Sequence, residues 1–525
     1  MSRKSTFVIG LLLLGLLLMP VLAFAGSGVQ GGDPNFTKTD AEEEGYWYSR
    51  YNLGNLVMRS GLGVTFMPQK EQVMKMIQAV DADSNDGDTA APAKNVTLLQ
   101  AIYASGDPHY TTKLDVNDFA TQRWNPDTFE KNITSQAMGW TIIKETEWAK
   151  QFHVDNHFGT PTDNFGAQWR FVGMIMNASS LMQSKYALEN MRNDQGLYAN
   201  SDGAVDWYGQ WVMLEALSDV SGILGAKTLP HSATNRYYNP QMGAMFLGGA
   251  DALFDAVSSR QPSDTREYSY AVQALNWYAA NTGNSANKAA AVALIDKFGA
   301  ALVNANKDDA ARKAYALRGL IEAWRTTGNN AYRDAAVDVY TGLASEYDGV
   351  HGVFTSQNVY SIEDVAAIMG AINSSLIFLG DAIDANQGET MFAGFFESAV
   401  NMSGLQQSVP PIPVAKGKFE QDEPPIFYGY PSIPKPPMAG GEFGVAPVFA
   451  SEVKWDGGQW QVTNARFDAA GAMHASNEFI WFHNDEVDGF PRVSGASTGG
   501  PTTLPTTGGS GMDVFWTRLI TFLSF

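Results

Sequence analysis

Hydrophobic residues between residues 136 and 402 recur at spacings of three and four, which is the pattern of helices that bury one face. The clearest examples are the segments 168–176, 210–217 and 270–278. Segments rich in aromatic and large apolar residues alternate with segments rich in alanine and charge, such as 287–305 and 332–346. Because a helix that is covered on nearly all sides is apolar all round, this alternation predicts the inner and outer helices of a ring.

Acidic residues precede five of the helical segments, and they return roughly every 43 to 58 residues, about the length of two helices and two loops. These starts are Asp163, Asp206, Asp264, Asp308 and the pair Glu363-Asp364. A repeat of this size cannot bury its apolar face alone, so the copies must pack side by side in an arc or a closed ring. We therefore expect the carboxylates to lie on one rim of that ring.

Changes in composition divide the rest of the chain. Helical segments are expected at 41–58 and 69–80, and a loop-rich stretch follows at 96–136. Alternating residues at 453–462 predict a β-hairpin, and 479–482 predict a further strand. The predicted units are a signal peptide (1–25), a helical and loop-rich segment (26–135), the helical ring (136–402), a Pro-rich linker (403–440), a small β-rich region (441–493) and a Gly/Ser/Thr/Pro linker with a short apolar tail (494–525). The predicted fold class is mainly α, an (α/α) toroid of helical hairpins with a small β-rich C-terminal portion.

The helical repeat resembles the six-hairpin (α/α) toroids, a superfamily that contains many glycoside hydrolases, N-acylglucosamine 2-epimerases and unsaturated glucuronyl hydrolases. The segments 206–211 and 309–320, which open two of the expected inner helices, carry the resemblance. It implies the toroid fold over roughly half of the chain. These toroids host hydrolysis, epimerisation, lyase chemistry and binding, so the resemblance leaves the activity open. No motif in the sequence selects a subfamily.

The N-terminus has the pattern of a secretory signal peptide. Arg3 and Lys4 precede an apolar run at 7–22, and residues 23–25 form a small-residue cleavage site before Gly26. The chain contains no cysteine, so an exported form has no disulfides and its stability must come from its core. The lack of cysteine also excludes thiolate metal sites and a cysteine nucleophile.

Near the C-terminus, Leu504-Pro505-Thr506-Thr507-Gly508 resembles the LPxTG sorting motif of sortase-anchored surface proteins. The apolar tail that follows, 514–525, departs from that pattern because it is short, contains Arg518 and ends without a basic cluster. We expect export to the outside of the cell or to its surface, with cell-wall or membrane attachment through this tail as one possibility.

The chain is acidic, with a net charge of −20 and an isoelectric point near 4.7. Such a protein repels duplex DNA and anionic lipid, so we expect no nucleic-acid partner. A neutral ligand such as a glycan, or a bound divalent cation, fits this charge.

Glycoside hydrolysis needs two carboxyl groups that face each other across the scissile bond, and carboxylates on a common rim could supply them. Asp163 and Asp206 are the preferred pair because aromatic residues accompany them. The candidate residues for stacking on sugar rings are Trp169, Trp207, Trp211 and Tyr268. The alternative is structural, since aspartates cap helix N-termini and aromatic residues at helical spacing usually belong to the core.

Two further segments carry candidate chemistry. In 153–157, Asp155 and His157 are candidates for acid–base catalysis, or, with His153, for holding a divalent metal; the alternative is an ordinary loop. The acidic loop 81–88 resembles a calcium loop, and its candidate ligands are Asp81, Asp83 and Asn85. It departs from the EF-hand spacing, because the glycine comes one position late and no terminal glutamate follows, so a solvated loop is the alternative. Calcium is the only cofactor that the sequence suggests.

Three functions remain open. The first is an exported carbohydrate-active protein, similar to a glycoside hydrolase, that acts on a neutral glycan in the funnel of the toroid. The second is a non-catalytic surface protein that binds a ligand, and the third is a subunit of an extracytoplasmic complex. Carboxyl groups that face each other across an open cleft would favour hydrolysis, whereas a filled or apolar funnel would count against it.

The signal-peptide pattern makes a direct prediction. N-terminal sequencing of exported protein should begin near Gly26, because the small-residue site at 23–25 is where a signal peptidase would cut. Reducing agents should leave the thermal unfolding midpoint unchanged, since the chain has no cysteine. Exported material that still carried Arg3 would contradict the prediction.

Overall fold

The computed structural model describes most of the chain outside the two termini. The described residues are 27–66, 73, 75, 95–116, 118–153, 166–229, 234–412 and 426–480.

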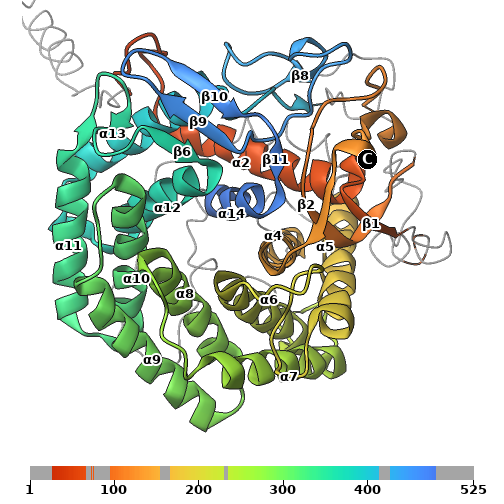
Figure 1. The fold of residues 1–525 in the computed structure, drawn as a ribbon, viewed down its shortest axis with the longest axis vertical. Helices are drawn as coiled ribbons and strands as arrows, with labels where there is room; N and C mark the ends of the chain where they lie inside the picture. The colour runs from red at the N-terminus through yellow and green to blue at the C-terminus, as the bar shows by residue number, and fades with distance from the viewer. Residues whose placement is uncertain are drawn as a thin grey trace, which may run out of the picture.

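Twelve α-helices in the described part of the chain form two concentric rings (Figure 1). The inner ring consists of α4 (Ser135–His153), α6 (Trp207–Gly225), α8 (Thr265–Asn281), α10 (Ala310–Thr327), α12 (Ile362–Phe378) and α14 (Ala469–Ile480). The outer ring consists of α2 (Lys38–Gly54), α5 (Gly166–Tyr186), α7 (Pro240–Val257), α9 (Ser285–Val303), α11 (Asn330–Ser345) and α13 (Ala385–Phe396). Each inner helix packs against its two inner neighbours, and the circle closes between α14 and α4. The predicted (α/α) toroid is confirmed.

Burial separates the two rings as the sequence pattern predicts. In the inner helix α6, 16 of the 19 residues are buried, whereas in the outer helix α9 only 5 of 19 are buried. An inner helix touches other helices on every side and therefore needs apolar or internally paired residues all round. An outer helix turns one face to water, where alanine and charged residues suffice.

The ring closes through the two ends of the described chain. The outer partner of α14 is α2, so the last inner helix packs against the first helix of the fold, and the ring extends beyond the predicted range of 136–402.

The predicted strand at 479–482 is wrong where the structure describes it. Phe479 and Ile480 belong to α14, and Phe479 is fully buried against Phe396 and Phe449. Four apolar residues in a row suit a buried helix as well as a strand, so their pattern cannot distinguish the two.

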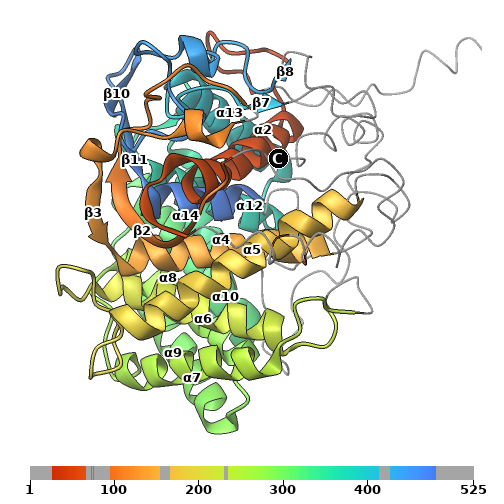
Figure 2. The same cartoon turned by 90° about the vertical axis from the view of Figure 1, so that its right-hand side faces the viewer.

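Short strands lie along one sector of the end of the ring at which the inner helices begin (Figure 1). Strand β2 (Leu98–Gly106) pairs with β1 (Gly63–Phe66), β3 (Glu130–Ile133) and β11 (Phe467–Asp468). Strand β9 (Glu452–Trp455) pairs with β10 (Trp460–Asn464), which confirms the predicted hairpin, and with β6 (Val359–Ser361). Strands β3, β6 and β11 lead directly into α4, α12 and α14, and Figure 2 shows β2, β3, β10 and β11 on one side of the ring.

The smaller elements complete the described chain. Two two-stranded sheets pair β4 (Tyr347–Asp348) with β5 (Val353–Phe354) and β7 (Pro411–Ile412) with β8 (Ile426–Phe427). π-Helical turns occur at Asn55–Ser60, Ala187–Met191 and Glu397–Met402, and 3-10 turns occur at Phe119–Gln122, Pro126–Thr128, Gly380–Ala382 and Pro436–Met438. The first π-helical turn extends α2 to residue 60, so the predicted helix at 41–58 is confirmed.

Acidic residues mark the starts of the inner helices, as the repeat predicts. The N-cap side chains of Asp206, Asp264 and Asp309 each accept a hydrogen bond from the first turn of α6, α8 and α10, so the third cap lies one residue after the expected Asp308. In α12 the N-cap is Ser361, and the pair Glu363-Asp364 occupies the first turn. Consecutive inner helices run in the same direction, so these residues share one rim. Asp163 lies outside the described residues, and the helix that begins after it, α5, belongs to the outer ring.

Lys144 of α4 is fully buried where the ring closes. Its amine donates hydrogen bonds to the Ser49 hydroxyl of α2 and to the Ser476 carbonyl of α14. Burial holds the pKa of Lys144 well below its usual value, which favours the neutral amine in the folded protein. The unfolded chain protonates the amine below about pH 10.4, so the folded state binds fewer protons than the unfolded state between its own lowered pKa and that pH.

We expect Lys144→Met to raise the free energy of unfolding at pH 7 by about 1 kcal/mol or more, because a buried amine is replaced by an apolar chain of similar length. The gain should shrink as the pH rises toward 10, which a urea titration at several pH values would measure.

Lys150 on the same helix is the matched control. Its amine lies 2.6 Å from Glu147 and 2.5 Å from Asp219. Lys150→Met leaves two buried carboxylates unpaired, so it should destabilise the fold by about 3 kcal/mol or more. Equal effects of the two variants would contradict the distinction between a buried lysine that bonds to neutral oxygens and one that is ion-paired with two carboxylates.

Candidate functional site

Glu363 is the carboxyl group that stands at the mouth of the inner ring. It is the second residue of α12, and the capping box of Ser361 and Asp364 fixes the turn that carries it. Ser361 accepts a hydrogen bond from the Asp364 amide at 3.0 Å, and Asp364 accepts one from the Ser361 amide at 3.1 Å. The side chain of Glu363 remains 19% exposed, although its Oε1 is buried.

Arg266 connects Glu363 to three other inner helices. It lies in the first turn of α8 and forms an ion pair with Glu363 of α12. Its guanidinium carbon lies 3.8 Å from the ring centre of Tyr208 in α6. Its Nη2 donates to Oε1 of Gln136 in α4 over 3.4 Å. The first turns of α4, α6, α8 and α12 are therefore tied together around one carboxylate.

His474 of α14 lies below Glu363, toward the centre of the ring. Its ring stacks on Trp140 with centres 4.3 Å apart and an interplanar angle of 25°. Its Nδ1 lies 3.9 Å from Oε1 of Glu363, and its Nε2 lies 3.9 Å from Oε1 of Glu478. Only 4% of the His474 side chain is exposed, so the imidazole is fixed between the two carboxyl groups.

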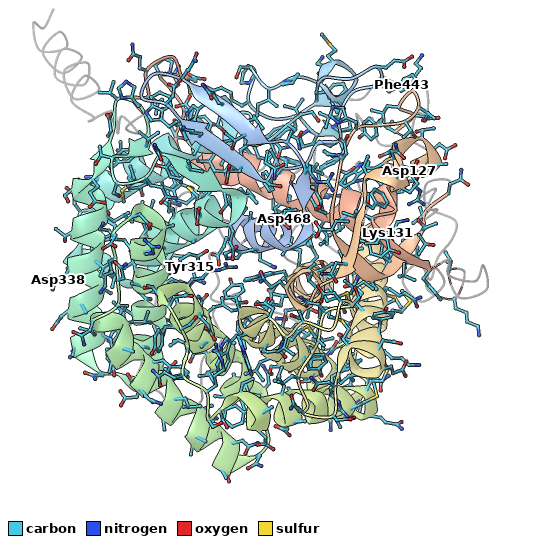
Figure 3. The ribbon with its side chains drawn as sticks, in the orientation of Figure 1. Asp127, Lys131, Tyr315, Asp338, Phe443 and Asp468 are labelled. Carbon is cyan, nitrogen blue, oxygen red and sulfur yellow. The ribbon has the colours of Figure 1, made fainter. Side chains whose placement is uncertain are left out.

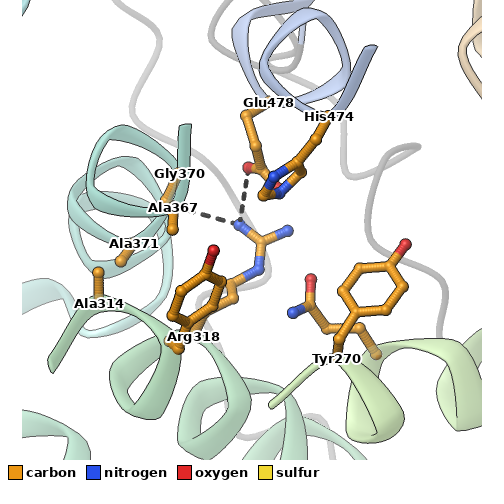
Figure 4. A pocket seen from close by; sticks show the side chains of 10 residues that line it. Tyr270, Ala314, Arg318, Ala367, Gly370, Ala371, His474 and Glu478 are labelled. Carbon is orange, nitrogen blue, oxygen red and sulfur yellow. Dashed lines mark hydrogen bonds and ion pairs between the residues drawn. The ribbon is translucent and has the colours of Figure 1, made fainter. Parts of the chain in front are cut away.

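A small pocket lies on the axis beside His474 (Figure 4). In it, Nη1 of Arg318 lies 3.6 Å from Oε2 of Glu478 and donates to the Gly370 carbonyl over 3.2 Å. A Cβ atom on Gly370 would lie 2.1 Å from Oε2 of Glu478, so a glycine is required for this carboxyl to approach α12. The lining residues are Tyr270, Gln273, Ala314, Tyr315, Arg318, Ala367, Gly370, Ala371, His474 and Glu478.

The pocket is too narrow for a sugar ring. Its empty space is about 250 Å³ including the part open to solvent, and the enclosed part has room for about one water molecule. Figure 3 shows Tyr315 and Asp468 beside the axis, whereas Asp338 points away on the outer ring. Polar side chains of the described residues fill this part of the axis, which counts against the predicted binding of a glycan in this pocket.

Burial shifts the pKa values of Glu363 and His474 in opposite directions. Burial raises the pKa of Glu363 to about 6, and the nearby charges of Asp364 and Asp468 act in the same direction against the ion pair with Arg266. Burial also lowers the pKa of His474 to about 3, helped by the positive charges of Arg266 and Arg318. Near neutral pH the imidazole is therefore uncharged, and Glu363 can both release and take up a proton.

Asp206 lies at the same rim but acts as a helix cap. Its Oδ2 accepts from the Gly209 amide at 3.0 Å and from Nε2 of Gln136 at 2.5 Å. Gln136 in turn contacts Arg266, so Asp206 borders the Glu363 cluster through one intermediate side chain.

The predicted stacking residues differ in exposure. Trp211 is 1% exposed, and its indole N–H donates to Glu267 at 3.1 Å, so it belongs to the core and its predicted contact with a sugar is wrong. Trp207 is partly exposed, and the Arg260 guanidinium covers one of its faces at 4.4 Å. Tyr268, also partly exposed, packs edge-on against Phe298 with ring centres 5.7 Å apart.

The remaining predicted residues lie outside the part that the structure describes, and their roles stay predictions. They are Asp155, His157, Asp163, the side chain of Trp169, and the calcium candidates Asp81, Asp83 and Asn85. The predicted pairing of Asp163 with Asp206 therefore stays a prediction.

The described residues form neither a metal cluster nor a membrane-spanning helix. Within the described ranges, no group of three or more histidine, aspartate and glutamate side chains is placed to hold a metal ion. None of the helices that the structure describes combines the length and apolar composition needed to cross a bilayer.

Sequence reasoning found Glu363 as a helix start but missed Arg266, Tyr208 and His474. A sixth acidic start was present in the sequence, since Asp468 directly precedes α14 and accepts a hydrogen bond from the Gly471 amide at 2.9 Å. His474 and Glu478 lie within that helix, four residues apart, and therefore on the same face of it.

Solved structures with a similar course of the chain include three proteins whose names refer to carbohydrates. Cellobiose 2-epimerase from Bacillus thermoamylovorans has a TM-score of 0.43 and 11% identity, and the match covers 78% of this chain and 99% of that protein. A mutant of unsaturated glucuronyl hydrolase from Streptococcus agalactiae has a TM-score of 0.40 and 10% identity, and the match covers 80% of this chain and 94% of that protein. A family 76 glycoside hydrolase (mannosidase) from Bacteroides thetaiotaomicron has a TM-score of 0.37 and 7% identity, and the match covers 79% of this chain and 99% of that protein. No protein-family model and no curated protein matches the sequence. The toroid assignment rests on the helix arrangement itself.

The raised pKa of Glu363 predicts a specific pH dependence of stability. The folded carboxyl titrates near pH 6, against 4.5 for the ordinary group, so the folded state binds more protons between these values. Its contribution to stability is fully present below about pH 4.5 and is lost as the pH rises through about 6, a change of about 2 kcal/mol.

We expect Glu363→Gln to remove this change, so the stability difference between wild type and variant should shift by about 2 kcal/mol between pH 4.5 and 7. Chemical unfolding at five or six pH values would measure it. The same substitution at Glu389, an exposed residue of α13, is the matched control. If the stability difference from wild type changed with pH no more for Glu363→Gln than for Glu389→Gln, the raised pKa of Glu363 would be contradicted.

Proposed function

We propose that this protein is a carbohydrate-active enzyme similar to a glycoside hydrolase, with Glu363 as its general acid. The observation that carries the proposal is a partly exposed carboxyl group with a pKa of about 6 at the mouth of the inner ring. A general acid works best when its pKa lies near the working pH, because it must hold a proton and also release it. The proposed substrate is a neutral glycan that binds at the rim.

The neighbours of Glu363 fit this role. Arg266 fixes one carboxyl oxygen, and Tyr208 lies beneath the guanidinium. In the proposed step, the protonated Glu363 gives its proton to the oxygen of the leaving sugar as the glycosidic bond breaks. Glycoside hydrolysis needs a second carboxylate as base or nucleophile, and Asp364 and Asp468 are the carboxylates whose charges act on Glu363. One of these two would activate the attacking water or attack the sugar itself.

Aromatic side chains on the same rim suit a sugar ligand. Trp207 and Tyr268 are partly exposed, and they come from the starts of α6 and α8, the helices that also supply Tyr208 and Arg266. Sugar rings present C–H groups that pack well on aromatic faces. The aromatic contacts would hold the glycan while Glu363 reaches the scissile oxygen.

The proposed location is outside the cell. It is supported by the signal-peptide pattern at 1–25, by the absence of cysteine and by the net charge of −20. Attachment through residues 504–508 is part of the same proposal. Both parts of this proposal rest on the sequence alone.

A non-catalytic binding protein is the second candidate, and the filled axis favours it. The pocket that the described residues form beside His474 has room for about one water, whereas a scissile bond needs a deeper cleft to enclose it. In that case the rim would bind a glycan or a protein partner without turning it over.

One experiment separates the two candidates. The wild-type protein is incubated with a panel of neutral glycans, and both new reducing ends and binding heat are measured. For the enzyme, Glu363→Gln should lower turnover at least about 100-fold and leave glycan affinity within a few fold, because the amide keeps the shape but has no proton to give. Glu389→Gln should keep full turnover.

Binding of a glycan by the wild type without any turnover would establish the non-catalytic alternative. Turnover that survives in Glu363→Gln would show that the general acid is another residue.

A further inference from the structure

Three buried carboxyl groups outside the Glu363 cluster each join two elements of the ring. They are Glu44 of α2, Glu145 of α4 and Glu215 of α6, and they are between 0% and 8% exposed. Their hydrogen bonds come from neutral side chains, and no cation of the described residues forms an ion pair with them.

We propose that these three glutamates are built into the fold as protonated, uncharged acids, so that the ring takes up three protons as it forms and loses stability when its surroundings become less acidic. An ionised carboxylate without a cation is costly to bury, whereas the protonated acid is a neutral hydrogen-bonding group. The inference goes beyond the proposed function and is independent of it, because it concerns the stability of the ring and not a reaction.

Glu215 joins α6 to α8 in the interior of the ring. The Tyr270 hydroxyl lies 2.7 Å from its Oε2. The charged groups that face it from α6, α4 and α14 are themselves acidic: Asp219, Glu147 and Glu478. The Lys150 ammonium is already held by Glu147 and Asp219, 2.6 Å and 2.5 Å away. Burial is the largest cause that raises the pKa of Glu215 to about 8, and the three acids act in the same direction.

Glu145 joins α4 to α5 beside strand β2. Nε2 of Gln183 in α5 donates to Oε1 of Glu145 over 3.0 Å and to the Leu99 carbonyl of β2 over 3.2 Å. The groups that act on the Glu145 carboxyl are neutral, namely the Ser179 hydroxyl and the Gln183 amide, and its Oε2 is buried without a hydrogen bond. Burial therefore holds the pKa of Glu145 well above its usual value.

Glu44 joins α2 to the π-helical turn Glu397–Met402. Nδ2 of Asn401 donates to Oε2 of Glu44 over 2.7 Å, and the Tyr48 hydroxyl lies 3.4 Å away. The charged groups that face it are again acidic: Asp40 on α2 and Glu397 at the start of the turn. The phenol of Tyr428, which follows β8, also faces it. Burial is the largest cause that raises the pKa of Glu44 to about 8.

All three pKa values are raised in the fold, so the folded state binds more protons than the unfolded chain at neutral pH. Each group contributes stability that is fully present below about pH 4.5 and is lost as the pH rises through its folded pKa. Between these limits each group raises the equilibrium constant for unfolding about tenfold per pH unit. Lys144 and His474 act in the opposite direction, because burial lowers their pKa values.

The test is chemical unfolding of the full-length protein at several pH values between about 5 and 7.5, for the wild type and for Glu44→Gln, Glu145→Gln and Glu215→Gln. Glutamine keeps the shape of the protonated acid but does not titrate, so it needs no proton to enter the core. The equilibrium constant for unfolding of each variant, divided by that of the wild type, should fall about tenfold per pH unit. Packing strain from the amide changes this ratio by the same factor at every pH, so the slope decides.

Glu267→Gln is the matched control. Glu267 of α8 is only 4% exposed, but Arg260 forms an ion pair with it and the Ser263 amide donates to it over 2.9 Å. Because the substitution removes this ion pair, the variant should be less stable than the wild type, and its ratio should not fall with pH.

A ratio that stays flat or rises with pH in any of the three folded variants would overturn the proposal. If a variant did not fold, the wild type would decide, because it must itself lose stability from about pH 5 to 7.5 when three groups gain a proton on folding and two lose one. A wild type that kept or gained stability over this range would equally overturn the proposal. Neither result depends on a substrate, so failure of glycan turnover would strike the proposed function and leave this one standing.

Discussion

The packing of α14 against α4 and α12 is the contact on which the rest of the structure depends, because it turns a row of helical hairpins into a closed ring. Closure lets every inner helix bury nearly its whole surface, and it places the first turns of all six around one rim. Helix N-termini carry partial positive charge, so such a rim attracts carboxylates. The pKa of Glu363 is nevertheless raised, since burial and the charges of Asp364 and Asp468 outweigh Arg266 and the helix ends.

Closure also forces polar groups into the centre of the ring. Arg266, Glu363, His474, Glu478 and Arg318 form a row in which positive and negative groups alternate on either side of a neutral imidazole. Pairing of this kind is the condition under which buried charges are tolerated, and removal of one member leaves another uncompensated. The row crosses α8, α12, α14 and α10, so each ion pair also fixes the rotation of one helix relative to the next.

The scaffold could be predicted from the sequence because its signals are local. Caps such as Asp206 and Asp264 and the periodicity that follows them lie within single helices, and the structure confirms them. The closing helix α14 was missed because it follows a long Pro-rich and β-rich stretch, and because its outer partner α2 lies more than 400 residues before it in the sequence. The Glu363–Arg266–His474 cluster was missed for a related reason. Its members come from three helices spread over about 200 residues, and only the closed ring brings them together.

A raised carboxyl pKa alone does not identify a functional site, since buried structural networks produce it as well. Burial raises the pKa of Glu44 and Glu215 to about 8 and that of Asp219 to about 7. These three residues are between 2% and 8% exposed and bond to neighbouring side chains, which accounts for them as parts of the core. Glu363 differs because 19% of its side chain is exposed, at the end of the ring where a ligand can arrive. Accessibility combined with a pKa near the working pH is what an acid catalyst requires, and a core carboxyl provides only the second of these properties.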